Sequence, residues 1–103
     1  MKHRSRLEIV KDILLVASDE GGVIKTRISY GASVGWGRLN QYLEELLKVG
    51  LLEHDGESSY WVTDKGEKFL RVYEDYGRSR KRLEEQIGNL ERERKALRNI
   101  AGL

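Results

Sequence analysis

Residues 63–101, TDKGEKFLRVYEDYGRSRKRLEEQIGNLERERKALRNIA, decide the fold of this chain because they carry a seven-residue repeat without a proline. One stripe of the repeat consists of Phe69, Tyr76, Leu83, Leu90 and Leu97. A second stripe, four residues after the first, consists of Tyr73, Arg80, Ile87, Arg94 and Ala101. Two stripes at this spacing are typical of a coiled coil. Since so long a helix has no core of its own, the pattern predicts a homodimer.

The order of residues along this seam favours antiparallel pairing of the two copies. In a parallel dimer, Arg80 and Arg94 would each face the same residue of the other copy, which places like charges together. An antiparallel pair centred between residues 87 and 90 instead sets each arginine beside a leucine of the other copy. The arginine then lays its methylene stem along the leucine and keeps its charge at the edge. We therefore predict an antiparallel coiled coil.

Composition excludes several classes of protein. The chain has 103 residues, two isolated His and no Cys, which excludes a disulfide, a zinc ribbon and a thiolate nucleophile. It also lacks a Gly-rich phosphate loop and clustered carboxylates, so we expect no enzyme, catalytic residue, cofactor, metal or small-molecule substrate. The charged start and the absence of a long apolar run predict no membrane segment and a cytoplasmic protein. Abundant Lys, Arg and Glu favour a thermophile.

The first 63 residues form a small domain whose elements follow from capping and turn signals. Ser5 and Glu8 make a capping box, Gly50 stops a helix, and Asp55-Gly56 is a hairpin turn. Thr63 caps the long helix. We expect helices over residues 5–17, 25–31, 35–49 and 64–101, a minimal strand at 23–24 and a hairpin over 51–62. This order predicts a mainly α fold with a small β-wing: a winged helix-turn-helix domain, 1–63, and a dimerising coiled-coil helix, 64–103.

Residues 24–70, IKTRISYGASVGWGRLNQYLEELLKVGLLEHDGESSYWVTDKGEKFL, resemble the Sulfolobus 10a family of archaeal DNA-binding proteins. The matching pieces are Lys25-Thr26-Arg27-Ile28, Tyr30, Ala32, Leu39-Asn40, Tyr42-Leu43, Gly50-Leu51 and Thr63-Asp64-Lys65-Gly66. With the heptads, the resemblance covers most of the chain. It implies a winged helix followed by an antiparallel coiled-coil dimer, and double-stranded DNA as the partner.

The helix expected over 35–49 carries the candidate base-reading residues. Arg38 suits guanine, while Asn40 and Gln41 suit adenine. Gly37 would let the backbone approach a phosphate closely. An ordinary solvated helix face is the alternative. Trp36 is a further candidate DNA-binding residue, although its spacing from Leu39 and Leu43 is that of a core residue and we favour that role over base stacking.

The start of the helix expected over 25–31 is a candidate phosphate site. Lys25, Thr26 and Arg27 bring two cations and a hydroxyl to the backbone N–H groups there, although plain capping and solvation would explain them too. Tyr30 is either a phosphate contact or a residue at the edge of the core. The acidic wing tip, residues 55–58, predicts weak contact with DNA.

Two basic segments have alternative explanations. The N-terminal Lys2, His3, Arg4 and Arg6 would form a flexible arm on the DNA backbone or a solubilising tail. Residues 78–82, RSRKR, would be a second DNA surface, but pairing with nearby glutamates of either copy is favoured.

These observations predict a homodimeric, non-enzymatic double-stranded DNA-binding protein. It would act as a transcriptional regulator or as a nucleoid-associated, chromatin-like architectural factor of an archaeon. Residues 1–63 hold eight Lys and Arg against nine Asp and Glu, so the head is not strongly basic. The alternative is therefore a protein-interaction module, with the coil as its scaffold.

Overall fold

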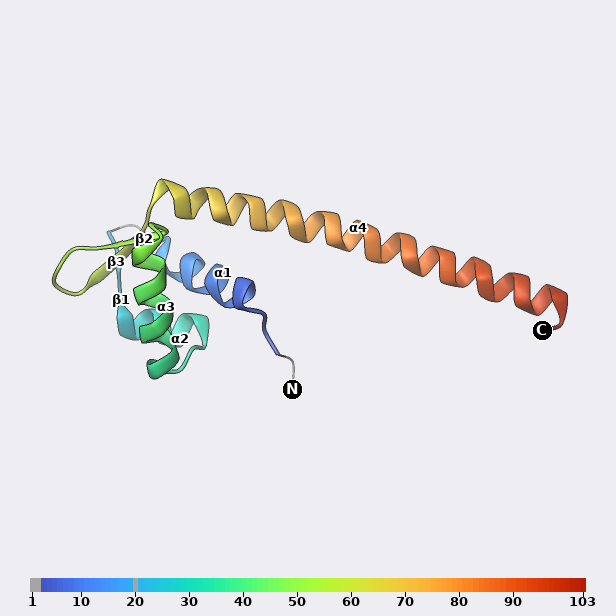
Figure 1. Cartoon of the computed structure of the whole chain (residues 1–103), viewed down its shortest axis with the longest axis horizontal. Helices are drawn as coiled ribbons and strands as arrows, with labels where there is room; N and C mark the ends of the chain where they lie inside the picture. The colour runs from blue at the N-terminus through green and yellow to red at the C-terminus, as the bar shows by residue number, and fades with distance from the viewer. Residues whose placement is uncertain (1–2, 20) are drawn as a thin grey trace. The chain divides into compact units, whose positions relative to one another are not determined.

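The computed structural model describes residues 3–19 and 21–103 (Figure 1). The elements are α1 (Arg6–Ala17), β1 (Val23–Ile24), α2 (Lys25–Ala32), α3 (Trp36–Lys48), β2 (Leu52–His54), β3 (Ser59–Val62) and α4 (Asp64–Ala101). This order confirms the predicted mainly helical fold with a β-wing. The chain divides into two compact units, the first ending at Val72 and the second comprising Tyr73–Leu103.

The first helix begins where the capping box predicts. The Ser5 side chain accepts a hydrogen bond from the Glu8 backbone N–H at 3.1 Å. Ile9, Ile13 and Leu14 are buried in the core of the first unit. Leu7, in the first turn of α1, is 54% exposed, although Leu14 two turns later on the same face is fully buried.

The turn between α2 and α3 is closed by backbone bonds to the end of α2. Ser33 adopts the left-handed conformation with φ 53°, and the Val34 N–H donates to the Ser29 carbonyl at 3.1 Å. The Ser29 hydroxyl donates to the Val34 carbonyl at 2.7 Å. Val34 is buried, and this places the next helix against the core.

The three strands form one antiparallel sheet in the order β1-β3-β2. Leu52 pairs with Val62, and Val23 pairs with Tyr60. The wing tip between β2 and β3 is held by Asp55, whose Oδ1 accepts hydrogen bonds from the N–H groups of residues 57, 58 and 59 at 2.8–3.1 Å. The predicted hairpin is thus present, with Asp55-Gly56 at its turn.

The start of α4 is fixed to the core of the first unit. Thr63 caps the helix as predicted, since its Oγ1 accepts a hydrogen bond from the Gly66 N–H at 3.1 Å. Phe69 and Leu70 pack against the buried core. Phe69, which the heptad pattern assigns to the seam, therefore already has a neighbour in its own chain, and its part in a dimer stays a prediction.

The second unit is a single helical segment whose apolar stripe is exposed. Tyr76, Leu83, Ile87, Leu90 and Leu97 are each 50% exposed or more. Tyr73 is half-buried, and its ring centroid lies 6.4 Å from that of Tyr76. The stripe follows the predicted seam, while the pairing of two copies stays a prediction.

Candidate nucleic-acid interface

Helix α3 presents two contrasting faces. Leu39, Tyr42, Leu43 and Leu46 are buried and fix the helix to the core. The opposite side, nearest the start of the helix, is exposed and consists of Trp36, Gly37, Arg38, Asn40 and Gln41. These five side chains or backbone positions are those that the sequence proposes for DNA contact. An arginine, an asparagine and a glutamine in the first two turns supply the donors and acceptors that base edges require.

Trp36 is not a core residue, and the expectation that it packs inside is wrong. Its side chain is 51% exposed, and the Lys25 ammonium lies 4.1 Å from the centre of its ring. Trp36 is the first residue of α3, so it stands beside the start of α2 and not over the core. This cation–π contact joins the starts of the two helices.

The starts of α2 and α3 leave backbone N–H groups for a ligand. The N-cap residues are Ile24 and Gly35, and among the described residues no side chain caps either helix. The Gly35 carbonyl accepts from the Leu39 N–H at 2.8 Å, so the first turn of α3 is formed. Unpaired N–H groups and the positive end of the helix dipole favour an anion such as phosphate. Lys25 adds a cation between the two starts.

Arg38 and Gln41 share a shallow depression with a residue that the sequence placed elsewhere. Arg6 lines it together with Tyr42 and Glu45. The Arg6 guanidinium lies 3.8 Å from the Glu45 carboxylate, and both side chains are mostly exposed, so this ion pair is weak. Arg6 therefore lies beside Arg38 and Gln41. The sequence offers no signal for this, because the contact joins α1 to α3.

The three remaining predicted contacts differ in their availability. Arg27 forms an exposed ion pair with Asp19, which competes with a phosphate for the same guanidinium. Tyr30 is 83% exposed and is not at the edge of the core, which leaves phosphate contact as its predicted role. Thr26 is exposed beside Lys25.

The sequence suggested that Arg4 belongs to a free N-terminal arm, but in the structure its side chain is held in place. Its guanidinium donates to the Asp12 carboxylate at 2.8 Å and to the carbonyls of Ala32 and Ser33 at 2.6 Å each. It thus closes the C-terminal end of α2, where a cation is favourable. Burial raises the pKa of Asp12, but hydrogen bonds from Lys11 and Arg4 outweigh it and hold that pKa below its usual value. Lys2 lies outside the described residues.

The wing tip carries a fixed negative charge. The backbone N–H groups of Glu57 and Ser59, then of Ser58, hold the pKa of Asp55 below its usual value. The His54 Nδ1 accepts a hydrogen bond from the Gly56 N–H at 3.1 Å. An ordered, acidic tip repels phosphates, in keeping with the weak contact that the sequence predicts.

Residues 3–19 and 21–103 also bear on other kinds of site. No group of three or more His, Cys, Asp or Glu in these ranges is placed to hold a metal. None of the helices described is both long and apolar enough to cross a bilayer.

Known proteins share this architecture. Residues 3–81 match the winged helix-turn-helix family model. Over 72 residues the chain is 33% identical to an uncharacterised protein of Methanocaldococcus jannaschii. The alignment covers 69% of this chain and 72% of that protein. The crystal structure of Sso10a-2, described as a DNA-binding protein from Sulfolobus solfataricus, aligns with a TM-score of 0.70 and 30% identity, over 84% of this chain and 96% of that chain.

Proposed function

The chain belongs to the winged helix-turn-helix family, in its Sso10a-like form, and we propose that it is a non-enzymatic double-stranded DNA-binding homodimer. In this proposal the start of α3 reads base edges in the major groove. The starts of α2 and α3 hold the DNA backbone, and the exposed stripe of the second unit joins two copies. The proposed location is cytoplasmic and nucleoid-associated.

The observation that carries the proposal is the exposed start of α3. Arg38, Asn40 and Gln41 are exposed on one end of a helix whose opposite face is buried, which is how a recognition helix presents side chains to a groove. The open N–H groups beside Lys25 and Trp36 add a phosphate site next to them. The similarity to Sso10a-2, described as a DNA-binding protein, supports DNA binding as the function.

Substitutions on α3 test this surface. Arg38→Ala and Gln41→Ala should each weaken binding to a preferred duplex by about 1–3 kcal/mol, because each removes one base contact. Lys25→Ala should weaken binding to all duplexes alike and lower the salt slope by about one. Lys48→Ala is the matched control, an exposed cation at the other end of the same helix. If the first three variants bind DNA as the wild type and the control do, the proposed surface is wrong.

The proposed dimer rests on the exposed stripe of the second unit. Leu83, Ile87 and Leu90 are 55%, 50% and 63% exposed, and a second copy of the stripe would cover them. In the antiparallel arrangement, Leu83 lies beside Arg94 of the partner subunit. A full-length chain with Leu83→Cys and Arg94→Cys should therefore form 83-to-94 disulfides between subunits on oxidation. Exclusive links between like positions would contradict antiparallel pairing.

The preference for a selected duplex over a random one distinguishes a transcriptional regulator from an architectural factor. An architectural factor binds random and selected duplexes with a ratio near one, whereas a regulator prefers its site by about 10³-fold or more. Competitive gel shifts measure this ratio directly. The ordered acidic wing gives the alternative, a protein-docking head, one supporting observation. Binding to DNA that weakens steeply with salt would exclude that alternative as the main activity.

A further inference from the structure

The side of the second unit that faces away from the apolar stripe is basic. We call this side the outer face, and its charged members between residues 78 and 95 are Arg78, Lys81, Arg82, Glu85, Arg92 and Lys95. They recur every three or four residues, the spacing that keeps side chains on one side of a helix. Lys81, Glu85 and Arg92 also border one shallow depression, with neutral Gly88 and Asn89 between them. Glu84 borders its edge and is paired with Arg80, so it is not counted with the outer face. Five cations thus share this side with one carboxylate.

Most of these cations are not neutralised by the chain itself. Arg78 pairs with Glu74 and Asp75 of the preceding turn. Within the described ranges, Lys81, Arg82, Arg92 and Lys95 form no ion pair. Arg82 and Arg92 donate only to the neutral side chains of Ser79 and Asn89. The expected pairing of residues 78–82 with glutamates therefore holds for Arg78, and for Arg80, whose Nε lies 3.5 Å from Glu84, but among the described residues it leaves Lys81 and Arg82 unpaired on the outer face.

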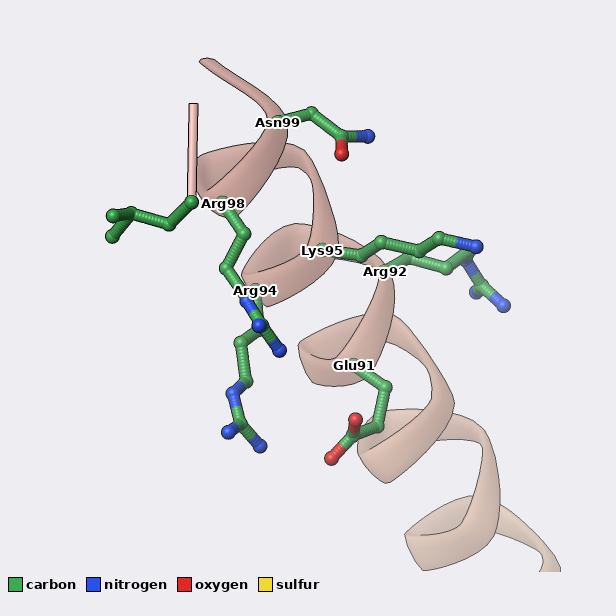
Figure 2. Close-up of a pocket in the computed structure, with 7 residues that line it drawn as sticks. Glu91, Arg92, Arg94, Lys95, Arg98 and Asn99 are labelled. Carbon is green, nitrogen blue, oxygen red and sulfur yellow. The ribbon is translucent and has the colours of Figure 1, made fainter. Parts of the chain in front are cut away.

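The outer face is separate from the seam. Figure 2 shows Arg92 and Lys95 projecting to one side of the helix, while Arg94 and Arg98 project to another. Arg94 belongs to the second stripe of the heptad repeat, so pairing of two copies would leave Arg92 and Lys95 in solvent. The outer face thus stays accessible in the proposed dimer.

We propose that the outer face is a second DNA-binding surface, which holds the phosphates of a duplex without reading its bases. The proposal rests on the DNA binding proposed above and adds a contact independent of α3. Residues 78 and 95 are 17 positions apart, and at a rise of about 1.5 Å per residue the surface extends roughly 25 Å. This is shorter than one turn of B-DNA, about 34 Å, so its cations lie within reach of phosphates on one side of a duplex.

The chemistry of the face favours DNA over an acidic protein. Protein interfaces are anchored by buried aromatic and aliphatic side chains. Between residues 78 and 96 the exposed large apolar side chains are Leu83, Ile87 and Leu90, all of which lie in the seam. The outer face offers cations separated by glycine, asparagine and alanine. Such a surface suits sequence-independent contact with a polyanionic backbone.

A salt titration of DNA binding tests the proposal in the full-length chain. The variant K81Q/R92Q/K95Q removes three cations and keeps residues that favour helix. If each cation contacts one phosphate, the slope of log K against log salt should become shallower by about 2.7. Between about 50 and 200 mM salt the wild type should then lose roughly 40-fold more affinity than the variant. The probe is one duplex of fixed sequence, measured by fluorescence anisotropy.

Two matched variants separate charge from structure. K81R/R92K/K95R keeps every charge and should bind as the wild type does, since phosphate contact of this kind requires a cation and not a particular side chain. Glu85→Gln removes the one carboxylate of the face and should tighten binding, with the largest gain at low salt. A purely structural role for these residues would give no such gain. Circular dichroism and sedimentation confirm that each variant keeps its helix and its assembly state.

The outcomes distinguish this proposal from the function on which it rests. A wild type that does not bind duplex DNA at about 50 mM salt overturns the proposed function itself. Wild-type binding that Arg38→Ala weakens, with a slope unchanged in K81Q/R92Q/K95Q, overturns only the role of the outer face. Loss of binding to polyglutamate with unchanged DNA binding would assign the face to an acidic protein and overturn the proposal.

Discussion

Gly66 lies in the first turn of α4, where the structure leaves no room for a side chain. A Cβ at this position would come within 2.4 Å of the Leu51 carbonyl oxygen and 2.5 Å of Val62 Cγ1. Real Cβ atoms do not approach other atoms so closely, so Gly66→Ala requires the backbone to move. We expect this variant to destabilise the first unit.

The magnitude follows from two opposing terms. Overpacking a filled site costs about 1–3 kcal/mol, and this site is at the upper end because the nearest atom belongs to the backbone. The Leu51 carbonyl also accepts the Thr63 N–H at 3.2 Å, so its retreat would lengthen that bond. Alanine regains about 1 kcal/mol over glycine in helix propensity. The net loss is about 2 kcal/mol, which lowers Tm by roughly 10 °C in a chain of this size.

Gly77 provides a matched control in the same helix. A Cβ there would meet no described atom within 4 Å, so Gly77→Ala gains helix propensity without a clash. Both variants should be melted at one protomer concentration by circular dichroism, because assembly makes Tm depend on concentration. Gly77→Ala should melt at or above the wild type, and Gly66→Ala below it. Equal melting temperatures for the two variants would refute the steric argument.

Three further predictions concern α1, the turn and α3. A Cβ at Gly37 would meet no described atom within 4 Å, so Gly37→Ala should not destabilise the fold; if the backbone there approaches a phosphate, gel shifts will show weaker DNA binding. Ser33 holds φ 53°, so Ser33→Gly should raise Tm by removing strain of up to about 1 kcal/mol. Asp12, whose folded pKa is lowered, stabilises the fold above its ordinary pKa of 3.8 and loses that contribution as pH falls through the folded value. Asp12→Asn should accordingly melt below the wild type at pH 6, and the difference should disappear in acid.

Local rules in the sequence were sufficient for most of the fold. Ser5 and Thr63 cap helices where hydroxyl capping predicts, and Asp55-Gly56 turns the wing. Each of these signals lies within three or four consecutive residues, so the sequence alone contains both the donor and the acceptor of each contact. The exposed start of α3 could be identified for the same reason, since Gln41 lies opposite the buried leucines and Arg38 lies at the side.

The errors occurred where a long-range contact decides the position. Arg4 bonds to the carbonyls of Ala32 and Ser33, 28 and 29 positions away, and no periodic pattern reports such a contact. Trp36 has the spacing of a core residue but begins its helix, where the neighbouring element is α2 and not the core. Helical periodicity predicts the direction in which a side chain points, but it does not predict which other element of the fold lies in that direction.

The heptad repeat shows the same distinction within one helix. Phe69 and Tyr76 occupy equivalent positions of the repeat, yet Phe69 packs against the core of the first unit while Tyr76 is 56% exposed. The pattern therefore predicted apolar contact at both positions but not which surface supplies it. Because Phe69 packs against the core of its own chain, the seam proposed for a second copy begins near Tyr73. In the proposed dimer, the apolar contact between two copies would then come from the stripe between Tyr73 and Ala101, and not from Phe69.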